Sequence, residues 1–238
     1  MPPKKESSKI INFYEKIPKH MLDNAENPNF HLHKFKLPFR ACVVSPSGGG
    51  KTNWLLNLIH LFSQGKGTFS TITIITRNKD QPIYKFLESK CEQIKILEGL
   101  HQTPQLDKMD KSTNSLCVWD DLVLSKDLSI VENYYIRARK LNCSVIFISQ
   151  DYHRIPTIVR RTCSYLILLK INGNRDLNAI LRECGLGLTK VQLLKMYEFS
   201  TDVKFSPLIV DFEAEPNERF RKGFTCICLL YTSPSPRD

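Results

Sequence analysis

Residues 39–64 decide the fold of this chain, and they read Phe39-Arg-Ala-Cys-Val-Val44, Ser45-Pro-Ser-Gly-Gly-Gly-Lys-Thr52 and Asn53-Trp-Leu-Leu-Asn-Leu-Ile-His-Leu-Phe-Ser-Gln64. An apolar strand leads into a glycine-rich loop that ends in Lys-Thr, and the loop begins a helix whose apolar residues recur at helical spacing. Glycines allow main-chain N–H groups to surround a phosphate, and the first turn of a helix directs its free N–H groups at the same anion. The segment therefore predicts a phosphate-binding loop.

We expect this loop to hold the phosphates of ATP through Ser45, Ser47, Gly48, Gly49, Gly50, Lys51, Thr52 and Asn53. In such a loop the lysine contacts the β- and γ-phosphates as a point charge, and the hydroxyl that follows it is a ligand of Mg²⁺. Lys51 and Thr52 have the spacing for these tasks. Ser45 is a departure, because it stands where the pattern G-x-x-x-x-G-K-[ST] has its first glycine. The alternative is a flexible glycine turn before Lys-Thr, and the flanking strand and helix argue against it.

Size and charge limit the class of protein. The chain has 238 residues, 42% of them hydrophobic, which is enough for one α/β domain with a full core. Its sequence contains no apolar run near the ~20 residues of a membrane span, and its first residues lack the apolar core of a signal peptide, so we expect an intracellular protein. The net charge of +10 and the pI of about 9.2 suit a polyanionic partner such as nucleic acid, although an ordinary basic protein would look the same.

The cysteines argue against two kinds of structural site. Of the eight cysteines, Cys42, Cys117 and Cys143 lie in predicted buried strands, where cysteine behaves as a small hydrophobic residue. The sequence contains no C-x-x-C pair. A structural zinc site and a secreted disulfide framework are therefore not expected.

From Phe39 onward the pattern alternates between strands and helices. The predicted strands are 39–44, 70–76, 94–97, 115–119, 143–149, 164–170 and 208–212, and the predicted helices are 51–63, 81–91, 126–140, 156–162, 174–184 and 188–198. Several of the strands are almost continuously apolar, which is typical of a parallel sheet with helices on both faces. We therefore predict a doubly wound α/β fold with a mostly parallel sheet.

Three segments follow from this pattern. Residues 1–33 are expected to form a basic N-terminal tail and a pre-core segment, and residues 34–227 the P-loop domain. Residues 228–238 resemble the translation of a sequencing adapter, so the natural reading frame is expected to end near Ile227.

Two carboxylates follow the apolar strand Leu116-Cys-Val-Trp119. The carboxyl ends of parallel strands are where open α/β sheets bind ligands. Asp120 is expected to hold Mg²⁺, usually through water, and Asp121 to orient or deprotonate the attacking water as the general base. The alternative is an acidic pair that caps a loop or the next helix, and the upstream phosphate loop makes that alternative weaker.

A polar residue and two arginine pairs surround the next apolar strand. Gln150 ends the strand Ser144–Ser149 and is expected to sense the γ-phosphate or the water, or else to be an ordinary polar residue at a strand end. An arginine that reaches the γ-phosphate of a neighbouring subunit contributes about 10³–10⁵ in rate. Arg139 is the first candidate for this role and Arg160 the second, the alternative for each being a solvated surface charge.

His31-Leu32-His33 suggests a different function. Two histidines that flank an apolar residue on a strand can bind the metal of a rolling-circle nuclease. That reading would need a catalytic tyrosine on a nearby helix and a different sheet, so it stays a minor alternative.

Taken together, these residues resemble the genome-packaging ATPases of large eukaryotic DNA viruses, virophages and polinton-like viruses, a branch of the FtsK/HerA superfamily of P-loop ATPases. The resemblance runs from about Lys34 to Phe212, and it is carried by the segments 37–52, 118–122, 137–150 and 152–161. It implies a RecA-like core of the additional-strand class, in which a strand is inserted beside the P-loop strand. It also implies a homo-oligomeric ring that threads double-stranded DNA into a preformed capsid by ATP hydrolysis. Lys140 stands where many relatives carry histidine after the arginine.

The resemblance assigns family roles to Lys51, Thr52, Asp120, Asp121, Gln150 and Arg139. We therefore expect a Mg²⁺-dependent ATPase that packages viral DNA, with capsid proteins as partners, in the host cytoplasm or viral factory and in association with the virion. Three alternatives remain. They are a DNA translocase of a plasmid or other mobile element, a small-molecule kinase with a P-loop, and an assembly factor that binds nucleotide without hydrolysing it.

Overall fold

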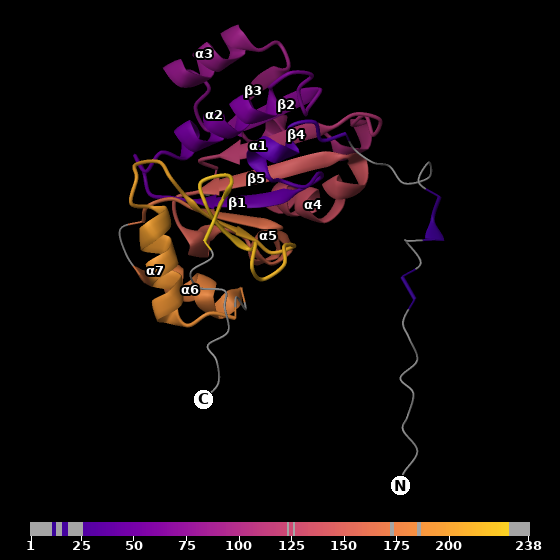
Figure 1. The fold of residues 1–238 in the computed structure, drawn as a ribbon. Helices are drawn as coiled ribbons and strands as arrows, with labels where there is room; N and C mark the ends of the chain where they lie inside the picture. The colour runs from indigo at the N-terminus through magenta and orange to yellow at the C-terminus, as the bar shows by residue number, and fades with distance from the viewer. Residues whose placement is uncertain are drawn as a thin grey trace.

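The structure is a computed structural model that describes residues 11–12, 16–18, 26–122, 124–125, 127–171, 174–184 and 187–228 (Figure 1). The strands are β1 (Arg40–Val44), β2 (Thr71–Thr76), β3 (Ile94–Glu98), β4 (Ser115–Asp120), β5 (Cys143–Ser149), β6 (Tyr165–Leu168), β7 (Leu208–Asp211), β8 (Phe220–Lys222) and β9 (Cys226–Ile227). The α-helices are α1 (Phe30–His33), α2 (Lys51–Phe62), α3 (Pro82–Lys90), α4 (Ser129–Arg137), α5 (Thr157–Thr162), α6 (Asn174–Glu183) and α7 (Lys190–Ser200). Short 3₁₀ helices are η3 (Leu100–Gln102), η4 (Leu106–Lys108), η5 (Ala138–Leu141) and η6 (Tyr152–Arg154).

The described strands form one sheet in the order β3-β2-β4-β5-β1-β6-β7-β8-β9. The first six strands of this order pair in parallel, and β7, β8 and β9 continue the sheet antiparallel. Strand β5 lies between β4 and β1, so the strand that ends before Gln150 separates the P-loop strand from the strand that carries Asp120. The predicted mostly parallel α/β sheet with an additional strand is confirmed.

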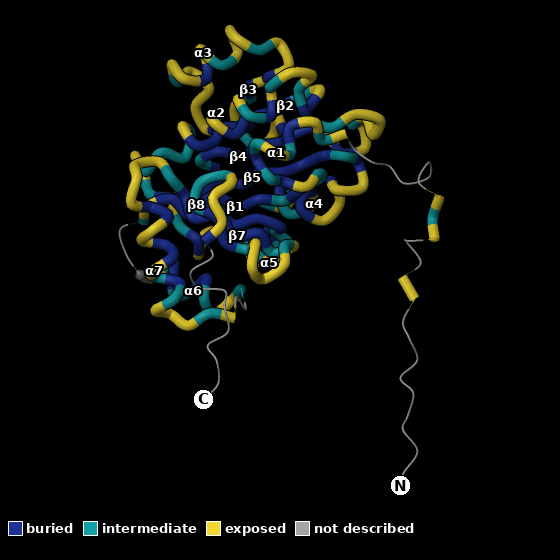
Figure 2. Tube along the Cα trace, in the orientation of Figure 1, coloured by how far each residue is buried: buried dark blue, intermediate teal, exposed yellow. Residues whose placement is uncertain are grey.

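Helices cover both faces of the sheet, as predicted. Alternate residues of a strand point to opposite faces. In β1, Cys42 and Val44 belong to one hydrophobic cluster, whereas Ala41 and Val43 belong to the other. The first cluster includes side chains of α4, α5, α6 and α7, and the second includes side chains of α2 and α3. Figure 2 shows the central strands as the most deeply buried part of the chain, and in Figure 1 α6 and α7 lie together, far from α3.

The predicted helix over 126–140 is shorter in the structure. It begins at Ser129 as α4 and changes into η5 at Ala138. The chain then reverses at Asn142, whose φ of 50° is a left-handed conformation that asparagine tolerates better than most residues. The tight turn brings Ala138 and Leu141 into the core and starts β5 at the next residue, Cys143.

Among the α-helices and strands, two regions were not predicted. Helix α1 lies in the pre-core segment, where the Asn29 side chain donates hydrogen bonds to the carbonyls of Phe62 and Gln64 at 3.1 and 2.9 Å and so ties it to the end of α2. Strands β8 and β9 form a hairpin at the far edge of the sheet. Cys228 is buried beside Ser200, and the rest of the predicted tail, residues 229–238, lies outside the described residues.

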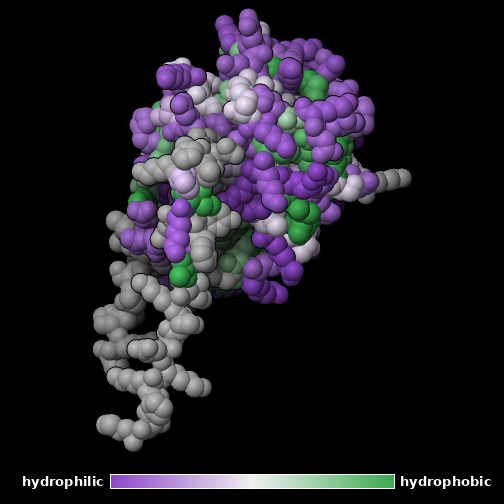
Figure 3. All heavy atoms as spheres, turned by 90° about the vertical axis from the view of Figure 1, so that its right-hand side faces the viewer, coloured by the Kyte–Doolittle hydropathy of each residue, from purple (hydrophilic) through white to green (hydrophobic). Residues whose placement is uncertain are grey.

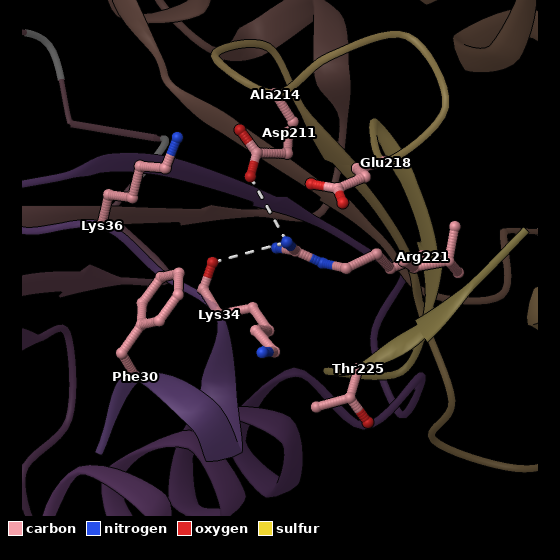
Figure 4. A pocket seen from close by; sticks show the side chains of 9 residues that line it. Phe30, Lys34, Lys36, Asp211, Ala214, Glu218, Arg221 and Thr225 are labelled. Carbon is pink, nitrogen blue, oxygen red and sulfur yellow. Dashed lines mark hydrogen bonds and ion pairs between the residues drawn. The ribbon is translucent and has the colours of Figure 1, made fainter. Parts of the chain in front are cut away.

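Arg221 of this hairpin makes a buried ion pair with β7 and a hydrogen bond to the segment that precedes β1 (Figure 4). Arg221 Nη1 donates to Asp211 Oδ2 at 3.3 Å and to the carbonyl of Lys34 at 3.4 Å, beside a cavity of about 160 Å³. Asp211 pairs with Tyr165 at the start of β6, so this pocket lies at the amino end of the parallel strands. The phosphate loop follows the carboxyl end of β1, so the pocket and the loop lie at opposite ends of the parallel strands.

Within the described residues, no helix is long and apolar enough to cross a membrane. The face of the molecule in Figure 3 is mostly hydrophilic, with separate small groups of hydrophobic atoms.

Candidate functional site

The glycine-rich loop connects the carboxyl end of β1 to the first turn of α2, as predicted. The N–H group of Ser45 donates to the carbonyl of Ser149 at 3.1 Å, which continues the β1–β5 pairing into the loop. Gly48 and Gly50 have φ angles of 73° and 94°, in the left-handed region that favours glycine. Gly50 is the N-cap of α2, so the loop ends where the helix presents its N-terminal N–H groups.

The serine that replaces the first loop glycine is accommodated inside the loop. Ser45 is fully buried, and a Cβ atom at Gly49 would lie 2.0 Å from Ser45 Oγ. The absence of a side chain at Gly49 therefore makes room for the Ser45 hydroxyl. This packing explains why the departure from the consensus leaves the loop geometry intact.

Lys51 folds back over the loop. Its Nζ donates to the carbonyls of Ser45 and Pro46, each at 2.9 Å. Burial lowers the pKa of Lys51, and the nearby carboxylates of Asp120 and Asp121 oppose this effect. The cation thus lies close to both acidic residues that the sequence placed at the end of β4.

Asp120 is the last residue of β4 and is only 5% exposed. Burial raises its pKa, while a hydrogen bond from the Tyr84 hydroxyl and the charge of Lys51 act in the opposite direction. Tyr84 comes from α3 and was not identified from the sequence, because a tyrosine on an amphipathic helix has no distinctive spacing to the loop. Two carboxylates beside one lysine leave a negative charge without a partner. A divalent cation bound to the buried Asp120 would compensate this charge.

The same tyrosine links the two predicted Mg²⁺ ligands. Its hydroxyl also interacts with the side chains of Thr52 and Thr76, and burial together with the Asp120 charge raises its pKa. Thr76 lies directly opposite Asp120 in the β2–β4 pairing. The Thr52 hydroxyl and the Asp120 carboxylate are hard oxygen donors, the type that Mg²⁺ prefers, and they lie around one phenol group.

Asp121 and Gln150 also meet, although 29 residues separate them in the chain. Gln150 Nε2 donates to Asp121 Oδ1 at 2.9 Å, because β4 and β5 are neighbours and both side chains follow the strand ends. Asp121 has a φ of 58°, a left-handed conformation that turns the chain sharply after β4. A cleft of about 400 Å³ opens beside Asp121 and leaves the carboxylate accessible.

The two candidate arginines are placed very differently. Arg139 lies on η5, before the start of β5, whereas Gln150 follows its end, and a strand of seven residues spans about 23 Å. Its side chain is 57% exposed, with Glu213 3.9 Å away. Arg160 is only 11% exposed and donates to Glu183 at 2.7 Å. Arg139 is therefore remote from the loop of its own chain and, with only a long surface contact to Glu213, is exposed enough to reach another chain, while Arg160 is held in a shorter, mostly buried ion pair.

Phe205 is a second residue that sequence reasoning missed. It lies between α7 and β7, and a Cβ atom at Gly50 would be 2.2 Å from its Cδ1 atom. The ring therefore fills the space that Gly50 leaves free. Its φ of 69° is unusual for an aromatic residue, and the side chain is still 40% exposed. Only the tertiary structure could reveal this contact, because Phe205 is far from the loop in the chain.

The histidine pair does not form the metal site of a nuclease. His31 and His33 lie on α1 rather than on a strand, so their side chains point in different directions. His33 is buried, its Nδ1 accepts from the Phe35 N–H group at 2.9 Å, and burial lowers its pKa to about 4. Among the residues that the structure describes, no group of three or more His, Cys, Asp or Glu side chains is placed to hold a metal ion. Ser47 and Asn53 are exposed near the loop, and their roles stay predictions.

Comparisons with known proteins agree with this geometry. Residues 29–211 match a family model described as Poxvirus A32 protein. No curated protein matches the sequence.

Three solved structures illustrate the fold. The genome packaging NTPase B204 from Sulfolobus turreted icosahedral virus 2, in complex with sulfate, superposes with a TM-score of 0.57 at 13% identity, covering 75% of this chain and 94% of that one. The DNA-packaging ATPase B204 from Sulfolobus turreted icosahedral virus gives 0.54 at 12% identity, with 75% and 94% coverage. EssC, ATPases 2 and 3, from Geobacillus thermodenitrificans gives 0.55 at 9% identity, with 84% and 41% coverage. These likenesses confirm the predicted P-loop ATPase fold.

Proposed function

The chain belongs to the Poxvirus A32 protein family, and from this premise we propose that it is a Mg²⁺-dependent ATPase that moves double-stranded viral DNA into a preformed capsid. The observation that carries the proposal is the meeting of Lys51, Asp120, Asp121 and Gln150 at one edge of the sheet. The names of the B204 structures, a genome packaging NTPase and a DNA-packaging ATPase, support the same reading.

The site residues suggest how hydrolysis would proceed. The N–H groups of the loop and the Lys51 ammonium would bind the β- and γ-phosphates. Thr52 and Asp120 would hold Mg²⁺, which would neutralise part of the phosphate charge. Asp121 would accept a proton from the attacking water, and Gln150, already bonded to Asp121 at 2.9 Å, would orient that water.

The partners follow from the same proposal. We place the ATPase domain at residues 34–227, after the basic tail and pre-core segment 1–33, and treat residues 228–238 as foreign to it. We propose a homo-oligomeric ring in which Arg139 of one subunit completes the site of its neighbour, with capsid proteins as further partners. The place of action would be the host cytoplasm or viral factory, and the virion.

The function can be tested by measuring whether DNA stimulates ATP hydrolysis and whether the protein transfers phosphate to another molecule. We expect long double-stranded DNA to increase the rate of ATP hydrolysis several-fold, because a translocase couples hydrolysis to its track. Phosphate release would be measured with and without DNA, and phosphate transfer to nucleosides would be measured in parallel. Transfer to a nucleoside would indicate a small-molecule kinase, and tight ATP binding without turnover would indicate an assembly factor. A plasmid-type translocase would be stimulated equally, and capsid genes beside this gene would argue for packaging.

Phe205 leads to a separate prediction about nucleotide binding. A phosphate loop lacks side chains so that an anion can approach its main chain, and the Phe205 ring lies against the loop where a Cβ of Gly50 would be. Nucleotide must displace the ring, at a cost of about 1 kcal/mol for a partly buried aromatic group. We therefore expect Phe205→Ala to bind ATP about fivefold more tightly, measured by isothermal titration calorimetry.

The matched control is Phe199→Ala, which removes a similarly exposed ring from α7. It should leave ATP affinity unchanged, because Phe199 packs against Lys222. Weaker ATP binding by Phe205→Ala would contradict competition and would mean that the ring supports the nucleotide.

A further inference from the structure

A basic groove lies between η6 and α6. It has a volume of about 620 Å³ and is lined by His153, Arg175, Asn178, Ala179, Arg182 and Glu183. We propose that this groove binds the phosphate backbone of double-stranded DNA. The inference rests on the proposed motor function and names the part of the surface that contacts the track.

The two arginines of α6 are arranged for a repeating anion. Arg175 and Arg182 are seven residues apart, so they lie two turns apart on the same side of the helix, separated by about 10 Å. Each phosphate of a DNA strand carries one negative charge, so two cations held at this separation can contact two phosphates of the same strand. The opposite side of α6 packs Leu177 and Ile180 into the core, which fixes the direction of the arginines.

Among the described residues, neither arginine belongs to an ion pair, although the Asp176 carboxylate lies near enough to Arg175 to oppose part of its charge. Both arginines are exposed. The acidic residues nearby are already engaged. Glu183 accepts from Arg160 at 2.7 Å, and Asp176 Oδ2 accepts from the N–H group of Tyr152 at 3.5 Å, with His153 Nε2 3.9 Å from its other oxygen. The lining of the groove therefore has a net positive charge, which favours the binding of a polyanion.

The groove is also close in the chain to the predicted γ-phosphate sensor. Helix η6 begins two residues after Gln150, and Asp151 Oδ1 caps it by accepting from the N–H group of His153 at 2.8 Å. Tyr152 is buried and its hydroxyl donates to Glu183 at 3.2 Å, which ties η6 to α6. A change in the position of Gln150 during hydrolysis would therefore shift one wall of the groove and the DNA held in it.

The test compares two double variants of equal charge. Arg175→Ala/Arg182→Ala removes the groove cations, and Lys66→Ala/Lys108→Ala removes two exposed cations elsewhere. Binding of a labelled duplex would be measured by fluorescence anisotropy at several salt concentrations with a non-hydrolysable ATP analogue present. Each lost phosphate contact reduces the slope of log K against log salt by about 0.9, so we expect the groove variant to lose about 1.8. Its affinity at about 0.1 M salt should fall roughly 10- to 60-fold.

ATP hydrolysis gives the second readout. The groove variant should need a correspondingly higher DNA concentration for half-maximal stimulation, while its rate without DNA equals that of the wild type. The control variant should match the wild type in both measurements, and Arg175→Lys/Arg182→Lys should recover most of the slope because phosphate contacts depend mainly on charge. Thermal unfolding of each variant checks that the fold is retained.

The outcomes separate the groove from the motor. If DNA stimulates the wild type but the groove variant keeps the wild-type salt slope, the proposed DNA-binding groove is wrong and the proposed motor function is unaffected. If DNA stimulates ATP hydrolysis by neither the wild type nor the variants, but the groove variant shows the predicted decrease in salt slope, the groove binds DNA and the proposed motor function is wrong.

Discussion

Lys51→Ala is expected to hydrolyse ATP roughly 10²–10³-fold more slowly than the wild type, since it removes the one cation placed on the phosphate loop. Lys51 Nζ now contacts two loop carbonyls at 2.9 Å and lies near Asp120 and Asp121. When ATP binds, the ammonium would exchange these carbonyls for phosphate oxygens and oppose the charge of the transition state. Steady-state phosphate release at saturating ATP measures the loss.

The fold should survive this substitution. Burial lowers the pKa of Lys51, which means that the folded state disfavours its charged form relative to the unfolded chain. Removal of the ammonium therefore costs no stabilising charge, and the Tm of the variant should not fall at neutral pH. Lys66→Ala, at an exposed position outside the site, is the control and should keep full turnover. An unchanged hydrolysis rate for Lys51→Ala would refute the assignment of the site.

Arg139→Ala is expected to lower ATP turnover by about 10³–10⁵ in a ring composed only of the variant, the contribution of an arginine supplied to a phosphoryl-transfer site. The structure makes this prediction specific to assembly. Arg139 is separated by the length of β5, about 23 Å, from the sheet edge that carries Gln150. It could therefore assist hydrolysis only in a neighbouring subunit.

Mixed rings distinguish this role from a simple loss of stability. Variant subunits added to wild type in increasing fractions should reduce activity more steeply than dilution, because each variant also disables its neighbour. Arg137→Ala is the matched control, since Arg137 lies on the same segment and is paired with Asp107 at 3.1 Å in its own chain. It should give only a linear effect or none, because exposed pairs contribute little. A linear loss for Arg139→Ala would remove the role in trans, and Arg160→Ala would then be tested in the same way.

Much of the site could be predicted from the sequence, because its central parts follow local rules. The phosphate loop is one continuous segment, and each of Asp120, Asp121 and Gln150 directly follows an apolar strand. Parallel neighbouring strands bring such residues to one edge, so their approach follows from the strand order. A local pattern was not sufficient at 126–140. The apolar spacing predicted one continuous helix, but the helix changes into η5 at Ala138 before the turn at Asn142.

Other parts could not be predicted because they depend on contacts between segments that are distant in the chain. Tyr84 reaches Asp120 only because α3 packs on the face of the sheet next to β4. Phe205 reaches Gly50 only because the segment after α7 returns over the loop. No periodicity or spacing in the sequence encodes either distance.

The sequence by itself determined the α/β class, the phosphate loop and the acidic pair, since these depend on backbone conformation and strand burial within short segments. The tertiary structure alone decided which arginine is free to act on a neighbour, which tyrosine bonds to the buried carboxylate, and where a basic groove opens beside α6. The physical reason is that side-chain contacts and net surface charge arise from packing, where residues far apart in the chain compete for the same space and the same partners.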